Sequence, residues 1–262
     1  SKDVSFATNI SFTTAKNLVK EIANGDKYIW GAGYGIPYNN LVRFQEGESP
    51  GIFWGYLTDG IFQNQSEVDN HATQPNAQPG DIRFVDVNGD GIVNADDRTK
   101  IGDPFADFSI GWNFNLNVYN FDLSVTTYGT FGNDIFRGFE RNLNYTNKPV
   151  SVLARWTGEG TSNFEPRATF VDSNNNVRPS TRYVEDGSYF KIKNVQLGYN
   201  FNVSNSKTLD AVRLYLQGKN LMTFTDYTGY DPEMSYGVLD TGIDRGNYPS
   251  PRTVSVGLNV KF

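Results

Sequence analysis

Hydrophobic and polar residues alternate along residues 252–262, which read RTVSVGLNVKF. The hydrophobic members of this stretch are Val254, Val256, Leu258, Val260 and Phe262. Successive side chains of a β-strand point to opposite faces, so the pattern predicts a strand with one apolar and one polar face. A tilted strand of about ten residues is long enough to cross the hydrocarbon core of a membrane. The stretch is therefore predicted to be one strand of a membrane barrel, provided that similar strands accompany it.

The same alternation recurs in several stretches of comparable length. They are residues 4–13, 106–118, 121–131, about 189–203 and about 211–223. A less regular strand is predicted from about Leu18, which gives about seven strands in all. The polar rows consist mostly of Ser, Thr, Asn and Gly rather than Lys and Glu. We therefore predict an all-β fold, a transmembrane antiparallel β-barrel of which this chain supplies a part.

Short turns alternate with long connections between these strands. The turns are 119–120 and 204–210, and the long connections are 24–105, 132–188 and 224–251. Outer-membrane barrels have short periplasmic turns and long extracellular loops. With a periplasmic C-terminus, the long connections are expected outside the cell, and a count of seven strands places residue 1 outside as well. Short β-like pieces are also predicted inside the first connection, at 41–44 and 52–57.

An odd number of strands has a structural consequence. Single-chain bacterial barrels have even strand numbers, and an unpaired sheet edge is not tolerated in lipid. The chain is therefore expected to be a C-terminal piece, with the remaining strands supplied by a missing part. A soluble β-sandwich also shows alternation and is the alternative. The length of the strands, the composition of the polar rows and the long polar loops favour the barrel.

Composition agrees with a barrel and excludes several other classes. The 262 residues are 38% hydrophobic and 15% aromatic, with a mean hydropathy of −0.49. An uninterrupted apolar run of about 18 residues, which a membrane-spanning helix needs, does not occur. The net charge of −6 argues against a nucleic-acid partner. The sequence has no cysteine and a single histidine, His71, which is interpreted as a solvated loop side chain. It opens on SKDVSF without a signal peptide, as expected of a mature or incomplete exported protein.

One motif carries recognisable chemistry. Residues 86–97 read DVNGDGIVNADD, and the candidate ligands are Asp86, Asn88, Asp90, the backbone carbonyl of Ile92, Asn94 and Asp97. These residues stand at positions 1, 3, 5, 7, 9 and 12 of a calcium loop, and Gly91 provides the sharp turn at position 6. Position 12 is Asp, as in dockerin-type loops, and residues 81–85 look extended, so no helix pair is expected. We predict one structural calcium ion that fixes an external loop, whereas a turn cluster that binds nothing is the alternative.

Aromatic residues also gather in the first long connection. They are Tyr28, Trp30, Tyr34, Tyr38, Phe53, Trp54 and Tyr56. Such rings could stack on sugars or peptides or dock a partner, or they could pack on one another and form a rim girdle. Neighbouring acids, namely Asp96 with Asp97, Glu46 with Glu48 and Asp240 with Asp244, are interpreted as solvated loop charges. No catalytic residue is predicted, and the protein is not expected to be an enzyme.

Longer phrases of the sequence resemble a known family. They are EGESPGIFWGYLTDGIFQNQSEV at 46–68, PGDIRFVDVNGDGIVNADDRTKIGDPFADFSIGWNFNLNVYNFDLSVTTYGTFGNDI at 79–135, DGSYFKIKNVQLGYNF at 186–201, LYLQGKNLMTFTDYTGYDPE at 214–233 and YPSPRTVSVGLNVKF at 248–262. In order and spacing they resemble the C-terminal part of SusC/RagA-type TonB-linked transporters of Bacteroidota. The resemblance spans nearly the whole chain.

The resemblance implies a barrel of about 22 strands in the outer membrane. It also implies an N-terminal plug and TonB box outside this sequence, a SusD-like surface lipoprotein over the mouth, and TonB-driven uptake of glycan or peptide. Residues 1–262 would then be wall strands and loops in contact with outer-membrane lipid, and residues 79–105 an extracellular segment that holds the calcium loop. Two other classes stay open: a passive porin or adhesin, and a secreted β-sandwich with a dockerin-like calcium loop.

Overall fold

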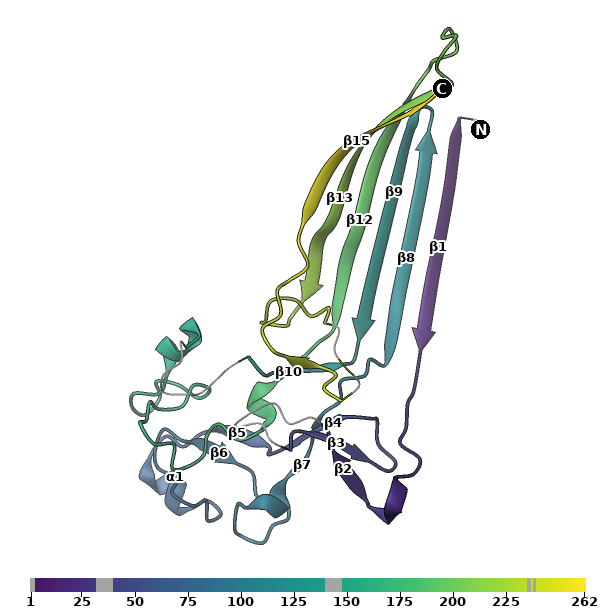
Figure 1. The fold of residues 1–262 in the computed structure, drawn as a ribbon. Coiled ribbons are helices and arrows are strands. Elements are labelled where there is room, and N and C mark those ends of the chain that lie inside the picture. Colours follow the sequence, from purple (N-terminus) through teal and green to yellow (C-terminus); the bar gives the residue numbers. More distant parts are fainter. Residues whose placement is uncertain (1–2, 32–39, 140–147, 235–236, 238) are drawn as a thin grey trace.

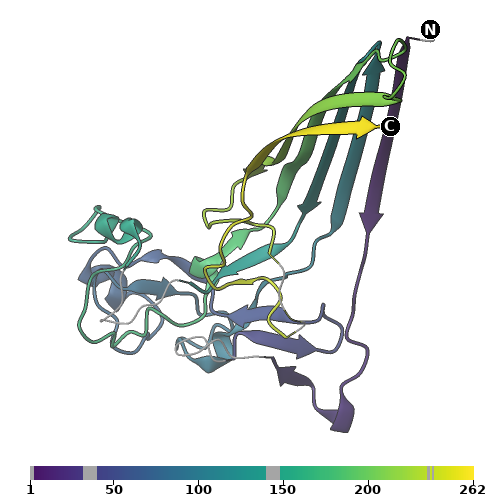
Figure 2. The ribbon, with the colours of Figure 1, turned by 45° about the horizontal axis from the view of Figure 1, so that its top comes forward.

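The computed structural model describes residues 3–31, 40–139, 148–234, 237 and 239–262. Its main element is a curved antiparallel sheet of six long strands in the order β1-β8-β9-β12-β13-β15 (Figures 1 and 2). The strands are β1 Val4–Thr14, β8 Phe108–Val118, β9 Phe121–Phe131, β12 Tyr189–Phe201, β13 Ala211–Thr225 and β15 Thr253–Lys261. Each predicted long strand except the one from about Leu18 is present. β1 and β15 form the two edges and do not pair with each other, so the sheet is not closed.

The prediction of a strand from about Leu18 is wrong. Val19 N–H donates to the carbonyl of Glu48 (3.0 Å), and Gly47 N–H donates back to the carbonyl of Val19 (2.9 Å). These bonds attach the stretch to the connection that follows it instead of to the sheet. With six strands instead of seven, β1 starts at the end that carries the short turns and the C-terminus (Figure 1). Residue 1, which the count of seven strands placed at the opposite end, lies outside the described residues, but Val4 at the start of β1 lies at the end with the short turns.

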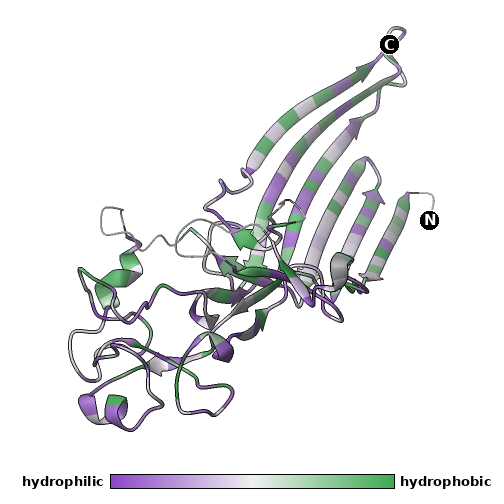
Figure 3. Cartoon of the chain, turned by 60° about the horizontal axis from the view of Figure 1, so that its bottom comes forward, coloured by the Kyte–Doolittle hydropathy of each residue, from purple (hydrophilic) through white to green (hydrophobic). Residues whose placement is uncertain are grey.

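One face of the sheet is continuously apolar. A single row crosses all six strands through Phe6, Leu116, Leu123, Leu197, Leu216 and Val256, each directly opposite the next. Phe6, Leu197 and Val256 are 59%, 47% and 73% exposed. Figure 3 shows the same alternation as bands along the strands. An exposed apolar band over a whole sheet is the lipid-facing surface of a membrane barrel.

The long connections fold together at the other end of the sheet. We call them the loop module, residues 15–107, 132–188 and 226–252. Its small sheets contain β2 Tyr28–Trp30, β3 Val42–Gln45, β4 Ile52–Gly55 and β7 Thr99–Gly102; β5 Thr58–Ile61 and β6 Ile82–Phe84; and β10 Asp134–Arg137, β11 Val184–Asp186 and β14 Ile243–Asp244. Its helical turns are α1 Gln65–Asp69 and the 3-10 turns Ala23–Gly25, Ala95–Asp97, Val150–Ala154 and Thr181–Tyr183. β3 and β4 confirm the short pieces predicted at 41–44 and 52–57.

The loop module has its own hydrophobic core. The core is formed by Leu41, Val42, Phe53, Ile101, Phe136, Tyr183 and Ile243. Phe53 and Phe136 come from the first and second connections, and their ring centroids are 5.9 Å apart. Ile243 comes from the third connection and lies opposite Phe136 in a parallel pair of β10 and β14. Burial of apolar surface thus joins three segments that are distant in the sequence. Among the described residues, no helix is long and apolar enough to span a membrane.

Candidate functional site

The six predicted calcium ligands lie in one compact loop of the module. The Asp86 carboxylate accepts hydrogen bonds from Gly89 N–H (2.7 Å) and Gly91 N–H (2.8 Å). Asp90 accepts from Ile92 N–H (2.8 Å) and Asn94 from Asp96 N–H (2.7 Å). Gly89 and Gly91 have φ values of 75° and 85°, a conformation that glycine adopts without steric cost. The chain therefore curls with its carboxylate and amide oxygens turned toward its own backbone.

Asp97 holds this loop closed from inside. It is fully buried, and its carboxylate accepts from the backbone N–H groups of Val87 (2.9 Å), Asn88 (3.3 Å) and Asn94 (2.7 Å). Burial alone would raise the pKa of Asp97, but these hydrogen bonds outweigh it and hold the pKa below its usual value. In the part of the chain that the structure describes, no group of three or more acidic or histidine side chains is arranged to hold a metal. Calcium binding stays a prediction.

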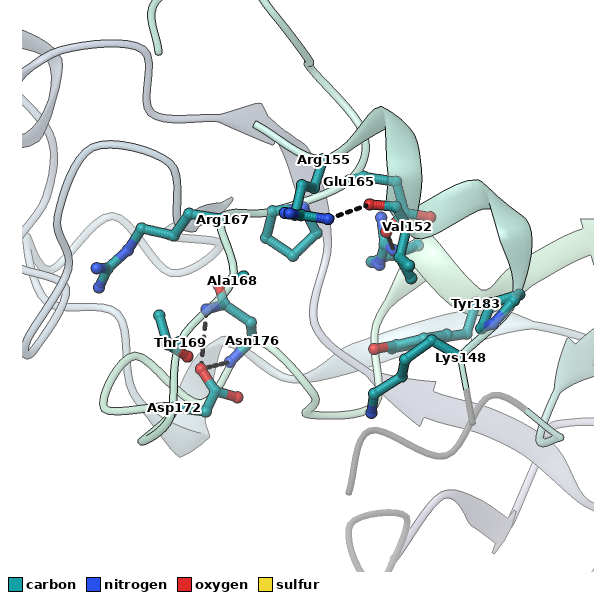
Figure 4. Close-up of a pocket in the computed structure, with 13 residues that line it drawn as sticks. Lys148, Val152, Arg155, Glu165, Arg167, Ala168, Thr169, Asp172, Asn176 and Tyr183 are labelled. Atoms are coloured by element: carbon teal, nitrogen blue, oxygen red, sulfur yellow. Dashed lines mark hydrogen bonds and ion pairs between the residues drawn. The ribbon is translucent and has the colours of Figure 1, made fainter. Parts of the chain in front are cut away.

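A pocket of about 260 Å³ opens beside the second connection (Figure 4). Its wall includes the basic residues Lys148, Arg155, Arg167 and Arg182 and the acids Glu165 and Asp172. Two of these cations are already paired: Arg182 with Glu165 (2.7 Å) and Arg167 with Asp81 (2.8 Å). Burial lowers the pKa of Lys148. The pocket thus combines apolar side chains such as Val152 and Pro166 with charged ones, two of which are paired within the module.

A buried ion-pair network ties the third connection to the sheet. Lys191, on the polar face of β12, is 2% exposed, and its Nζ lies 3.0 Å from Asp231 and 2.8 Å from Glu233. Lys193 pairs with Glu233 as well. Burial would raise the pKa values of both acids, but their bonds to the lysines lower them below the usual range. Alternation did not predict this position, because Lys191 has the same parity as the apolar Val195 and Leu197, and the register shift between Ile192 and Asn194 moves it to the polar face. Its partners, some 40 residues away, had no signal in the sequence either.

A second ion pair crosses the polar face of the sheet. Arg213 on β13 donates from its Nε to Asp122 on β9 (2.9 Å), although β12 lies between these two strands. The pair passes over Gly198 of β12, which is opposite both Asp122 and Tyr215. A Cβ at Gly198 would collide with Asp122 Oδ1 and Arg213 Nη2. The glycine is therefore what allows the two charges to meet.

Two expectations about single charged residues are wrong. Asp97 and Asp244 are buried instead of solvated, because backbone donors surround Asp97 and the Tyr227 hydroxyl donates to Asp244 (2.5 Å). Glu48 pairs with Lys100 (2.9 Å). His71 is half-buried with its ring 5.1 Å from that of Phe62. Tyr34 and Tyr38 lie outside the described residues.

The comparisons with known proteins agree with this geometry. No family model matches the chain. The TonB-dependent receptor P3 of Formosa agariphila is 34% identical to it over 281 residues, which cover 100% of this chain and 27% of that receptor. The TonB-dependent receptor SusC of Bacteroides thetaiotaomicron is 26% identical over 100% of this chain and 25% of its own length. A solved structure of the RagAB peptide transporter has a TM-score of 0.76 at 18% identity, over 100% of this chain and 28% of that one.

An antiparallel sheet with an exposed apolar face, a polar face and its long connections at one end is part of the wall of a transmembrane β-barrel. The similar proteins identify the kind of barrel. The chain corresponds to a portion of a TonB-dependent receptor of the SusC/RagA type, which confirms the resemblance seen in the sequence. It spans about a quarter of the length of the curated relatives it matches, and this share fits a C-terminal portion.

Proposed function

We propose that the protein containing this chain imports glycan or peptide across the outer membrane with energy supplied through TonB. The observation that supports this most directly is the similarity of the whole chain to receptors named as TonB-dependent. Residues 1–262 provide wall strands and loops and carry no catalytic chemistry. The plug, the remaining strands and the contact with TonB belong to the rest of the protein, and pairing with those strands covers the edges of β1 and β15.

The orientation and the surface partner are part of the same proposal. The loop module faces the outside, and the short turns and the C-terminus face the periplasm, as is usual for such barrels. A SusD-like lipoprotein covers the loop end. Exposed apolar side chains on the module, among them Val150, Leu153 and Phe170, support a protein contact there, since large apolar patches on a surface mark interaction sites.

Uptake measurements test the proposal. A strain that depends on the full-length receptor should lose uptake of its glycan or peptide when TonB is deleted and regain it when TonB is restored. A passive porin would keep its uptake without TonB, and that result would overturn the proposal. Deletion of the lipoprotein partner alone should lower uptake without changing the amount of receptor in the membrane.

One calcium ion in residues 79–105 is the second part of the proposal. The ligand spacing and the compact loop closed by Asp97 favour it. A chelator should make this segment at least about ten times more sensitive to protease in the wild type, because the ion would no longer offset repulsion between the acids. Asp86→Ala combined with Asp90→Ala should be equally sensitive with or without chelator. Asp69→Ala, an acid elsewhere in the module, is the matched control. Equal resistance of the wild type in both conditions would contradict the ion.

A further inference from the structure

Four residues on one face of a small sheet in the loop module, together with Arg98 just before β7, form what we call the arginine–aromatic cluster: Tyr28, Trp30, Arg43, Trp54 and Arg98. Arg43 on β3 is directly opposite Trp30 on β2. Its guanidinium lies between two rings, with its central carbon 3.7 Å from the centroid of Tyr28 and 3.7 Å from that of Trp54. Both faces of this cation are therefore covered by aromatic rings.

Arg98 adds a second guanidinium beside the first. Its central carbon lies 5.1 Å from the Trp30 ring, and its Nη2 donates to the carbonyl of Trp54 (3.0 Å). The two cations are close enough to repel each other. Burial lowers the pKa of both, and the charge of Arg43 contributes to the effect on Arg98. Two positive charges are thus held together by ring stacking and by the backbone carbonyls of Asn40 and Trp54, both of which accept from Arg98 Nη2.

The cluster contains no counter-charge. Arg43 Nε and Arg98 Nε are both buried and have no hydrogen-bond partner, and neither arginine forms an ion pair with the described acids. Most other arginines of the chain do form one, namely Arg83, Arg137, Arg167, Arg182, Arg213 and Arg245. Arg155, Arg178 and Arg252 also form no ion pair with the described acids, and Arg178 is stacked on Tyr56 and Phe84. What distinguishes Arg43 and Arg98 is that two such cations lie next to each other.

The cluster is also open to solvent. Tyr28 is 40% exposed, whereas the two arginines and Trp30 and Trp54 are half-buried. The rings cover the faces of Arg43 and its Nε is buried, so a ligand would approach this guanidinium at its terminal nitrogens. A guanidinium edge offers two parallel donors that match the oxygens of a carboxylate or sulfate. An exposed aromatic ring beside it can stack on a sugar or peptide unit that carries the anion.

We propose that the arginine–aromatic cluster binds a carboxylate or sulfate group of an acidic ligand. Arg43 and Arg98 supply the charge and the hydrogen bonds, and Tyr28 and Trp30 contact the ligand backbone next to the anion. The inference deepens the proposed import function by assigning an acidic cargo, and only this role as cargo rests on that function. Acidic glycans and acidic peptides share the required chemistry, so the experiment separates them.

The test is calorimetric titration of the full-length receptor with its lipoprotein partner in detergent. The probes are an oligogalacturonate, a dextran sulfate oligosaccharide, hexaglutamate and a neutral dextran oligosaccharide. At least one acidic probe should bind at least about tenfold more tightly than the neutral one, and its affinity should fall with added salt. Binding of the sugars alone identifies a glycan ligand, and binding of hexaglutamate alone a peptide. Equal binding of the neutral and acidic probes, or no binding of any acidic probe, would overturn the proposal.

Variants link this binding to the cluster. Arg43→Gln and Arg98→Gln should each weaken the acidic probe about 10- to 100-fold, as expected for a lost bond to a charged group. Arg43→Lys should lose less affinity for the acidic probe than Arg43→Gln, because lysine keeps the positive charge although it cannot stack as a planar group. Arg83→Gln, whose arginine pairs with Asp59 and Glu67, should bind as the wild type does. Wild-type affinity in both Gln variants would exclude the cluster as the site.

Two further measurements keep the result interpretable. In the wild type, the acidic probe should change tryptophan fluorescence, because Trp30 and Trp54 lie in the cluster; this readout needs no variant and so does not depend on variant folding. Uptake assays with and without TonB are run in parallel. Acid-selective binding with TonB-independent uptake would leave the site standing and remove the import function. TonB-dependent uptake without acid-selective binding would support the import function and exclude the proposed binding site.

Discussion

At the scale of single residues, Gly198 decides whether two charges can meet across a strand. Gly198→Val should separate Asp122 from Arg213 and cost about 1–3 kcal/mol, since added atoms in a filled site force neighbours to move. Gly158→Val is the control, because a Cβ there meets nothing within 4 Å. Denaturant titration of the folded receptor in detergent measures the difference. Equal loss in both variants would mean that the ion pair contributes nothing specific.

Lys191 is a second residue whose substitution is expected to lower the stability of the folded chain. Lys191→Met leaves Asp231 and Glu233 close together without their buried cation, which should cost about 3 kcal/mol or more. Hydrogen exchange of residues 226–252 should then become faster. Combining Lys191→Met with Asp231→Asn and Glu233→Gln should restore part of the protection, because the repulsion is removed. An unchanged rate of hydrogen exchange in Lys191→Met would contradict the idea that Lys191 anchors this connection to β12.

Low pH should weaken the same ion-pair network. The pKa values of Asp231 and Glu233 are lowered in the folded chain from ordinary values of 3.8 and 4.5. Their contribution to stability is therefore fully present above about pH 4.5 and is lost as the pH falls through the lowered values. Unfolding by denaturant, followed across this range, should show a steeper loss in the wild type than in the Asp231→Asn, Glu233→Gln variant.

At the scale of elements, alternation was enough to place the six long strands. The predicted stretches 121–131 and 4–13 agree with β9 and β1 within one residue. The stretch from about Leu18 misled because its apolar side chains suggest a strand while its backbone bonds lie with Glu48 in the loop module. Alternation indicates on which face of a strand a side chain lies, but not which segment forms hydrogen bonds with that strand. An error of one strand was enough to reverse the expected position of the chain's start.

The loop module was beyond such prediction. Its core joins Phe53, Phe136 and Ile243 from three connections, and no local pattern identifies contacts of that range. The calcium motif was visible because its ligands are contiguous in sequence, and the structure does place them in one loop. The stacking of Arg43 between Tyr28 and Trp54 depends on the register of β2, β3 and β4. The clustering of aromatic residues signalled the region but not the cations within it.

At the scale of the whole molecule, the exposed apolar row separates a membrane barrel from a soluble sandwich. Leu197→Arg places a charge on this row and should cost about 1–4 kcal/mol, depending on its depth in the bilayer. Asn115→Arg, at an exposed position on the polar face opposite Ala7 and Ser124, should be tolerated. The folded fraction in lipid vesicles, read from the mobility of unheated samples on gels, measures both. Similar folding of the two variants would argue that the row does not contact lipid.

The shared core of the loop module also constrains how such receptors can exchange specificity. A recombination event that replaced one connection alone would leave Phe136 or Ile243 facing a foreign partner, and the transplanted loop would lack its packing. The three connections are therefore expected to change together in evolution, although they are separated along the sequence. Chimeras between relatives should fold when all three are transferred together on a constant set of strands.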